Sequence, residues 1–152
     1  MSTRWLLAAI HLLGLGIGLG SVWARARALR GQLDSAGVRQ VLSADTWWAV
    51  AAAVWISTGL LRAFGGFEKG SSYYLNNHLF LTKMGLLVLV IVLEIGPIME
   101  FTRWRRALGR RSAPDTAQAG RFAWISLIQA FLVILMLIAA TGMARGFGSV
   151  TT

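Results

Sequence analysis

The chain has 152 residues, of which 56% are hydrophobic and only 14% charged, and its mean hydropathy is +0.61. A soluble domain has roughly 45–50% apolar and about 25% charged residues, so soluble globular and disordered proteins are excluded. The absence of cysteine excludes disulfides, thiolate metal ligands and cysteine nucleophiles. In so apolar a chain the net charge of +9 indicates the orientation of membrane spans, and we expect no nucleic-acid partner.

Four apolar stretches are each long enough to cross a bilayer as a helix, for which ~20 residues are needed. They cover residues 5–23, 47–64, 79–99 and 122–143. Each stretch is uniformly apolar rather than alternating, which favours helices over the strands of a barrel. The sequence therefore predicts an all-α fold, an integral membrane four-helix bundle that occupies residues 1–152 as a single domain.

The basic residues indicate how this bundle is oriented. The connections after the first and third spans hold ten of the fifteen basic residues, namely Arg25, Arg27, Arg30, Arg39, Arg103, Arg105, Arg106, Arg110, Arg111 and Arg121. Because basic connections remain in the cytoplasm, both termini are expected on the outer, periplasmic side of a bacterial cytoplasmic (inner) membrane. The lipid bilayer is the first expected partner of these arginines.

The segment between the first two spans is less apolar, and its apolar residues fall roughly on one helical face. For residues 31–44 this pattern is typical of a short helix that lies on the inner surface of the membrane. Asp45 is then expected to cap the N-terminus of the second span.

His11 is the first candidate for chemistry. It lies about 9 Å below the outer surface, and Gly14 and Gly18 follow it on the same face of the helix. A histidine at this depth is ligated, or else it is a neutral imidazole hydrogen-bonded to a neighbouring helix. A flat cofactor such as haem, ligated by His11, would fit over the two glycines, whereas the structural alternative is tight helix packing at Gly14/Gly18 and Gly16/Gly20.

Two further ionisable residues lie inside the third span. Lys83 lies at a depth similar to that of His11, and Glu94 shares its helix face but lies nearer the cytoplasmic end. Both are catalytic candidates, although Lys83 can also snorkel to the interface. Arg25 lies at a depth comparable to Glu94 and continues the His11 face, so it is expected either to pair with Glu94 or to meet a carboxylate of the cofactor.

A second axial ligand for haem is less easily found. His78 lies about 8–9 Å shallower than His11, and Met84 matches the depth of His11 better. A single histidine with an open or weak sixth position is therefore expected, with Met84 as a further cofactor-binding candidate. Arg62 is the nearer candidate for an anionic group, unless it snorkels to the outer interface.

Several runs of residues resemble an uncharacterised family of small bacterial four-helix membrane proteins, a predicted membrane domain of unknown function. The runs are His11–Gly20, Ala24–Arg30, Asp45–Trp48, Arg62–Gly70 and Lys83–Gly85, together with Glu94. In the placement of its histidine, lysine and arginines the chain is more distantly similar to HemJ-type protoporphyrinogen oxidases and to CopD-type membrane domains. This resemblance implies haem b, with His11 as its axial ligand and Lys83 as a cation near the tetrapyrrole.

Three functions remain open at this point. The first is a haem b protein in redox or tetrapyrrole chemistry, in which His11 ligates the iron. The second is a non-catalytic accessory subunit that packs in a larger membrane complex or a homodimer, which the two-sided glycine pattern favours. The third is transport of an ion or small solute along a polar path formed by His11, Lys83 and Glu94.

Overall fold

The computed structural model describes residues 2–65 and 75–148, and within these ranges it consists of helices without a strand. The helices are α1 (Ser2–Ala28), α2 (Ser35–Phe64), α4 (His78–Gly109) and α5 (Ala119–Ala144). All four are long and apolar enough to cross a membrane. The predicted all-α, four-span architecture is confirmed, and each predicted span lies within one of these helices.

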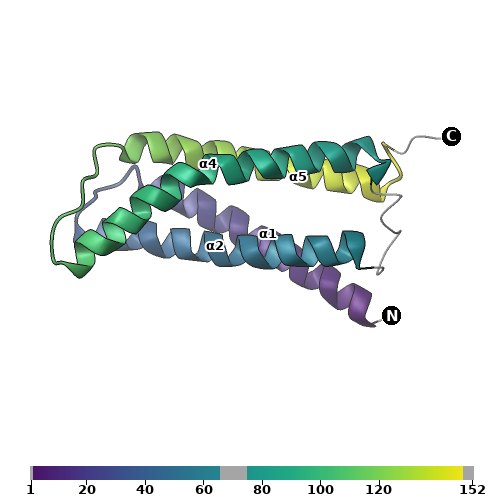
Figure 1. Cartoon of the computed structure of the whole chain (residues 1–152), viewed down its shortest axis with the longest axis horizontal. Coiled ribbons are helices and arrows are strands. Elements are labelled where there is room, and N and C mark those ends of the chain that lie inside the picture. Colours follow the sequence, from purple (N-terminus) through teal and green to yellow (C-terminus); the bar gives the residue numbers. More distant parts are fainter. Residues whose placement is uncertain (1, 66–74, 149–152) are drawn as a thin grey trace.

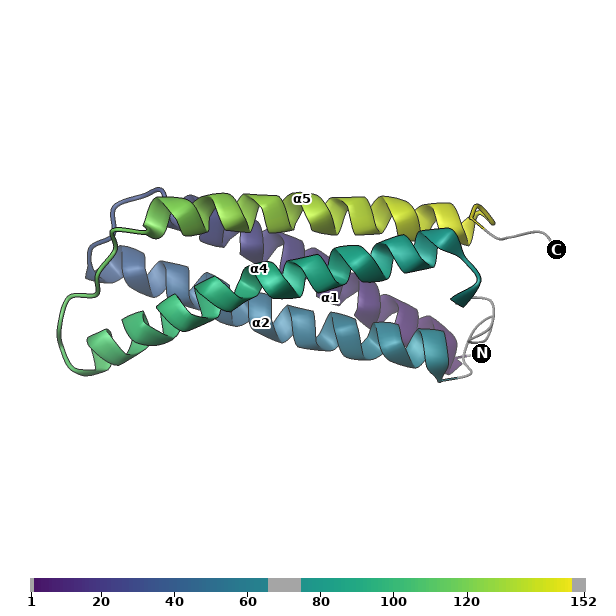
Figure 2. The same cartoon turned by 45° about the horizontal axis from the view of Figure 1, so that its top comes forward.

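The four helices form two antiparallel hairpins, α1 with α2 and α4 with α5 (Figures 1 and 2). α1 also packs against α5, whereas α2 and α4 touch over only a short stretch. The start of α1 and the end of α5 lie at one end of the bundle, called here the terminal end (Figure 1). Residues 29–34 and 110–118 connect the helices at the opposite, connection end. The side of the membrane on which each end lies stays a prediction.

α2 begins well before the predicted second span. Its N-cap is Asp34, whose carboxylate accepts from the backbone N–H groups of Ala36 and Gly37. The expectation of a separate surface helix over 31–44, with Asp45 as the cap of the next span, is therefore wrong. The apolar face of this segment does not rest on the membrane surface, because it is buried in the core at the connection end. That core is made of Ala28, Leu29, Val38, Val41, Leu42, Phe101, Trp104, Ala119, Phe122 and Ala123.

α4 changes direction partway along its length (Figure 1). Pro97 lies inside this helix and is fully buried. A proline in a helix interior removes one backbone hydrogen bond and bends the helix, so we attribute the bend to Pro97. The C-terminal part of α4 reaches the N-terminal part of α2, where Arg105 contacts Leu42 and Asp45.

The buried core is less extensive at the terminal end. There, the cluster of buried apolar side chains consists of Ala63, Phe80 and Met143, with Leu79 and Met84 packed against it. The aromatic pairs Phe101–Trp104 and Phe101–Phe122, by contrast, fill the connection end. The two hairpins are thus closely packed at one end of the molecule and leave space between them at the other.

The glycines of α1 divide between the two sides of the helix, as the sequence predicts. A Cβ atom at Gly14 would lie 3.3 Å from the backbone nitrogen of Trp55, and one at Gly18 would contact Ala51 and Trp48 of α2. A Cβ at Gly16 or Gly20 would meet nothing within 4 Å. The first pair therefore allows α1 and α2 to approach closely, while the second pair faces outward.

We predict that Gly14→Leu destabilises the bundle and that Gly16→Leu does not. The larger side chain at Gly14 would be forced against the backbone of α2, and overpacking of this kind costs about 1–3 kcal/mol. Thermal unfolding of both variants in a mild detergent measures the difference. Equal midpoints for the two variants would contradict the close approach of α1 and α2 at Gly14.

Candidate functional site

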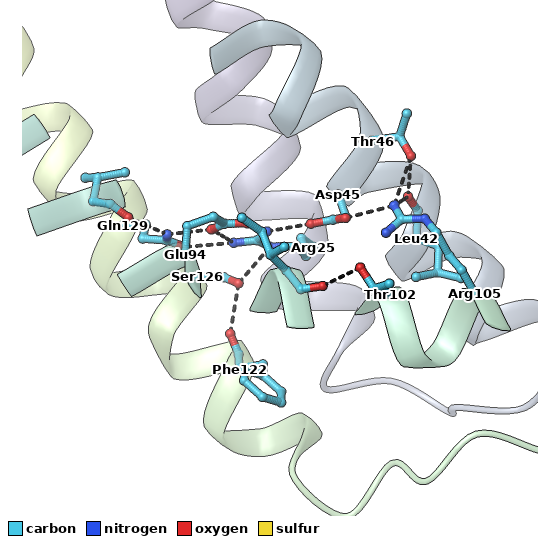
Figure 3. A network of polar contacts seen from close by, with 12 residues as sticks. Arg25, Leu42, Asp45, Thr46, Glu94, Thr102, Arg105, Phe122, Ser126 and Gln129 are labelled. Atoms are coloured by element: carbon cyan, nitrogen blue, oxygen red, sulfur yellow. Dashed lines mark hydrogen bonds and ion pairs between the residues drawn. The ribbon is translucent and has the colours of Figure 1, made fainter. Parts of the chain in front are cut away.

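Arg25 of α1 lies at the centre of a polar cluster that joins all four helices (Figure 3), and its side chain is completely buried. Its Nε donates to Ser126 Oγ at 3.0 Å, and its Nη1 donates to Asp45 Oδ1 at 2.8 Å. Glu94 accepts from Nη1 at 2.7 Å and from Nη2 at 3.0 Å. Gln129 Oε1 accepts from Nη2 at 2.7 Å. These contacts engage all five N–H donors that a guanidinium carries.

A second arginine balances the charge of this cluster. Arg105 Nη2 donates to Asp45 Oδ2 at 2.8 Å and to the backbone carbonyl of Leu42 at 3.3 Å. Gln129 Nε2 donates to Glu94 Oε2 at 2.6 Å. Two guanidinium groups thus face two carboxylates. We call this set the Arg25 cluster: Arg25, Asp45, Glu94, Arg105, Ser126 and Gln129.

The sequence anticipated one pair of the cluster and missed the rest. The expected pairing of Glu94 with Arg25 is confirmed. Ser126 and Gln129 were overlooked, although two polar residues three positions apart in an otherwise apolar span indicate an inward-facing polar contact. Glu94, a catalytic candidate from the sequence, is held by Arg25 and Gln129 and so joins α4 to α1 and α5.

A cavity of about 460 Å³ lies between the hairpins, toward the terminal end. All four helices contribute to its walls, which are mainly apolar. Its lining includes His11 from α1, Trp55 and Arg62 from α2, Lys83 from α4 and Met136 from α5. This volume falls within the range of roughly 300–1,000 Å³ that is typical of pockets for small molecules and cofactors.

His11 is buried in the cavity wall, with 8% of its surface exposed. Its Nδ1 lies 3.0 Å from the carbonyl oxygen of Trp55 and 3.0 Å from Thr58 Oγ1. The Thr58 hydroxyl donates to the carbonyl of Val54 at 2.7 Å, so both neighbours of Nδ1 act as acceptors. Nδ1 therefore carries the proton, and in the neutral ring the lone pair is on Nε2. The expected hydrogen bond from the imidazole to a neighbouring helix is thus present.

The position of His11 depends on a glycine. A Cβ atom at Gly59 of α2 would lie 3.1 Å from Cε1 of His11. The imidazole also packs against the indole of Trp55, with the ring centroids 5.8 Å apart. The ring is therefore held from one side by α2, through two hydrogen bonds and this close backbone approach.

Two of the other predicted site residues come close to His11. Lys83 lines the same cavity, as the haem hypothesis requires. Met84 lines a smaller recess of about 40 Å³ that shares His11, Trp55 and Lys83 with the main cavity. His78, in contrast, is exposed at the first residue of α4. Ligation by two histidines therefore finds no support in this arrangement.

Three other predicted cofactor-binding residues are placed elsewhere. Gly14 and Gly18 contact Trp55, Trp48 and Ala51 of α2, so they serve helix packing and do not form a floor under a cofactor. Arg25 belongs to the Arg25 cluster, where its charge is balanced by carboxylates. These three residues therefore lie against other helices and outside the lining of the cavity.

Parts of the sequence-based prediction lie outside the described residues. These are residues 66–74, between the second and third predicted spans, and with them the end of the Arg62–Gly70 run. Within residues 2–65 and 75–148, three or more His, Asp or Glu side chains nowhere gather into a group that could hold a metal ion. A cofactor that is ligated by a single histidine does not require such a group.

The structure is that of a multi-pass helical membrane protein. Its four helices are long enough to cross a membrane, and they surround a cluster of buried ion pairs and a cavity lined by one histidine. Residues 3–148 match the family described as predicted membrane protein, DUF2214, and the chain belongs to that family. No curated protein and no solved structure matches the chain. The resemblance to a family of predicted membrane proteins is therefore confirmed.

We predict that Arg25→Met strongly destabilises the bundle. The change leaves the Asp45 and Glu94 carboxylates buried without their main counter-charge, which typically costs about 3–5 kcal/mol. Arg103→Met is the matched control, because Arg103 is 68% exposed and its 3.3 Å pair with Glu100 is worth about 0–1 kcal/mol. The midpoint of thermal unfolding in detergent is the measurement. Similar midpoints for both variants would show that the cluster does not hold the helices together.

Proposed function

We propose that the chain is a membrane-embedded haem b protein in which Nε2 of His11 ligates the iron, and that it acts in redox or tetrapyrrole chemistry. The observation that carries the proposal is the geometry of His11. Its Nδ1–H is directed to two acceptors, Trp55 and Thr58, on the wall of a cavity of about 460 Å³. In metal-ligating histidines, a hydrogen bond donated by the nitrogen that does not bind the metal fixes the tautomer and the ring orientation. It also raises the basicity of the ligating nitrogen.

The chemistry of the cavity supports the same ligand class. Haem b has a flat apolar body and two carboxylates, and the cavity combines apolar walls with the basic residues Arg62 and Lys83. These two residues would pair with the carboxylates, while the apolar walls would exclude water from the ring. Haem would supply a one-electron redox centre. Lys83 would hold its ammonium group, and hence a proton at Nζ, beside the bound tetrapyrrole.

The same proposal includes an orientation in the bacterial inner membrane. Arginines are concentrated at the connection end, where Arg30 also stacks on Trp124 with its guanidinium carbon 5.0 Å from the ring centroid. Trp124 is 64% exposed, as expected for a tryptophan at the headgroup level. The connection end would therefore face the cytoplasm, with the terminal end and the cavity toward the periplasm.

An accessory or homodimeric packing role is the second candidate. It is favoured by the open space at Gly16 and Gly20, which lets another helix approach the outer face of α1. The transport hypothesis gains no comparable support. Its polar path needs Glu94 beside His11 and Lys83, whereas Glu94 is bonded to Arg25 and Gln129.

We predict that the purified protein shows a Soret band, and that dithionite reduction sharpens its α and β bands. His11→Ala is expected to abolish haem retention because the axial ligand is lost, while His78→Ala retains it. Thr58→Val removes one hydrogen-bond acceptor of Nδ1. It should weaken haem binding by roughly tenfold, as is typical when a hydrogen-bond partner of a metal-ligating histidine is lost. The measurement is the ratio of haem to protein after expression with ample haem.

Two results would end this proposal. A featureless spectrum of the wild-type protein would remove haem binding altogether, and full retention by His11→Ala would remove His11 as the ligand. In the first case, purification from native membranes with a stoichiometric partner would support the accessory role.

A further inference from the structure

The cavity reaches the lipid-facing surface of the bundle between α2 and α4. The smaller recess that adjoins it is lined mostly by apolar side chains of these two helices, with His11, Lys83 and Met136 at its inner side. We call this recess the seam, and its outer residues are Ile56, Leu60, Phe64, Met84 and Leu87. Leu60 and Phe64 are 49% and 50% exposed, on a helix long and apolar enough to cross the membrane. A molecule dissolved in the bilayer therefore meets the seam before it meets His11.

The wall shared by the seam and the main cavity carries an unsatisfied donor. Trp55 lines both spaces and is only 7% exposed. Its indole Nε1 is buried and has no hydrogen-bond partner among the described residues. Native proteins rarely leave a buried donor unpaired, and such a group next to a cavity points to an acceptor on a ligand.

The charges around the cavity limit further the chemical class of ligand that fits it. Within the described part of the chain, the ionisable side chains in the cavity lining are His11, Arg62 and Lys83, all of which are basic. The remaining lining is largely apolar. An amphiphile with a long or flat apolar body and a carboxylate complements both properties.

We propose that the cavity receives an amphiphilic carboxylate directly from the bilayer through the seam, and that Trp55 Nε1 donates to an oxygen of this ligand. The inference concerns the same cavity as the proposed function. Haem b and membrane fatty acids share the required chemistry, so the experiment must distinguish them. Entry from the membrane does not depend on which of the two is the natural ligand.

The test uses the full chain from a haem-deficient host, reconstituted in phosphatidylcholine vesicles. The probe is a long-chain fatty acid with a diazirine in its acyl chain, and mass spectrometry locates the label after illumination. We expect label on Met136, which is 1% exposed and lines the cavity, but not on Phe101, which is 0% exposed at the connection end. Label confined to lipid-facing residues would overturn the proposal.

A matched pair of variants tests the route. Leu60 and Leu61 are both 49% exposed on α2, and of the two it is Leu60 that lines the seam. Leu60→Trp is expected to fill the seam and lower labelling of Met136 several-fold, while Leu61→Trp leaves it unchanged. Equal labelling in both variants would show that the ligand enters elsewhere.

The chemistry of the ligand is tested with a second probe. A fatty alcohol with the same diazirine chain lacks the carboxylate and is expected to label Met136 several-fold less than the acid. Trp55→Phe should lower labelling by the acid several-fold, because the N–H donor is lost. Equal labelling by acid and alcohol would overturn the requirement for a carboxylate.

Added haem b separates this inference from the proposed function. If haem occupies the cavity, it competes with the fatty acid and lowers labelling of Met136. Labelling of Met136 that haem b does not reduce would support the seam and contradict the haem site. A Soret band without any labelling of Met136 in the haem-free protein would support the haem site and overturn entry of fatty acids through the seam.

Discussion

The burial of one guanidinium group constrains the whole bundle. Arg25 has no exposed side-chain surface, and a charge in that position is tolerated only when every donor is matched and the charge is balanced. Its partners come from α2, α4 and α5, so a single side chain fixes the depth and rotation of three neighbouring helices. Charge-assisted hydrogen bonds are directional, and a helix that slipped by one residue would lose them.

This constraint explains why the two ends of the molecule differ. At the connection end, the Arg25 cluster and the aromatic core close the space between the hairpins. α4 bends toward α2 there, whereas toward the terminal end the hairpins enclose the cavity and meet through contacts such as the Phe64–Phe80 ring pair. The closed end balances its buried charges within the cluster, and the basic residues His11, Arg62 and Lys83 line the cavity at the open end.

The sequence was sufficient for whatever depends on position along a helix, and insufficient for what depends on rotation about it. Span lengths and the Glu94–Arg25 pair follow from apolar runs and from depth, and both are confirmed. Packing between helices decides which residue Gly14 contacts. The sequence pattern alone therefore could not decide whether Gly14 lies under a cofactor or against Trp55 of α2. Asp45 was misassigned because an amphipathic segment looks the same on a membrane surface and against a core.

The distribution of the buried charges also bears on how the protein enters the membrane. The first hairpin contains Arg25 and Asp45, which bond to each other, and the second contains Glu94 and Arg105. In the second hairpin Glu94 is also bonded to Gln129. The first hairpin therefore carries a buried cation and a buried anion, whereas Arg105 of the second hairpin is 40% exposed and bonds to Asp45 of the first. Glu94 has Gln129 as its side-chain partner within the second hairpin, and it gains its cation, Arg25, when the two hairpins associate. Association of the hairpins therefore neutralises the buried carboxylate that the second hairpin brings into the membrane.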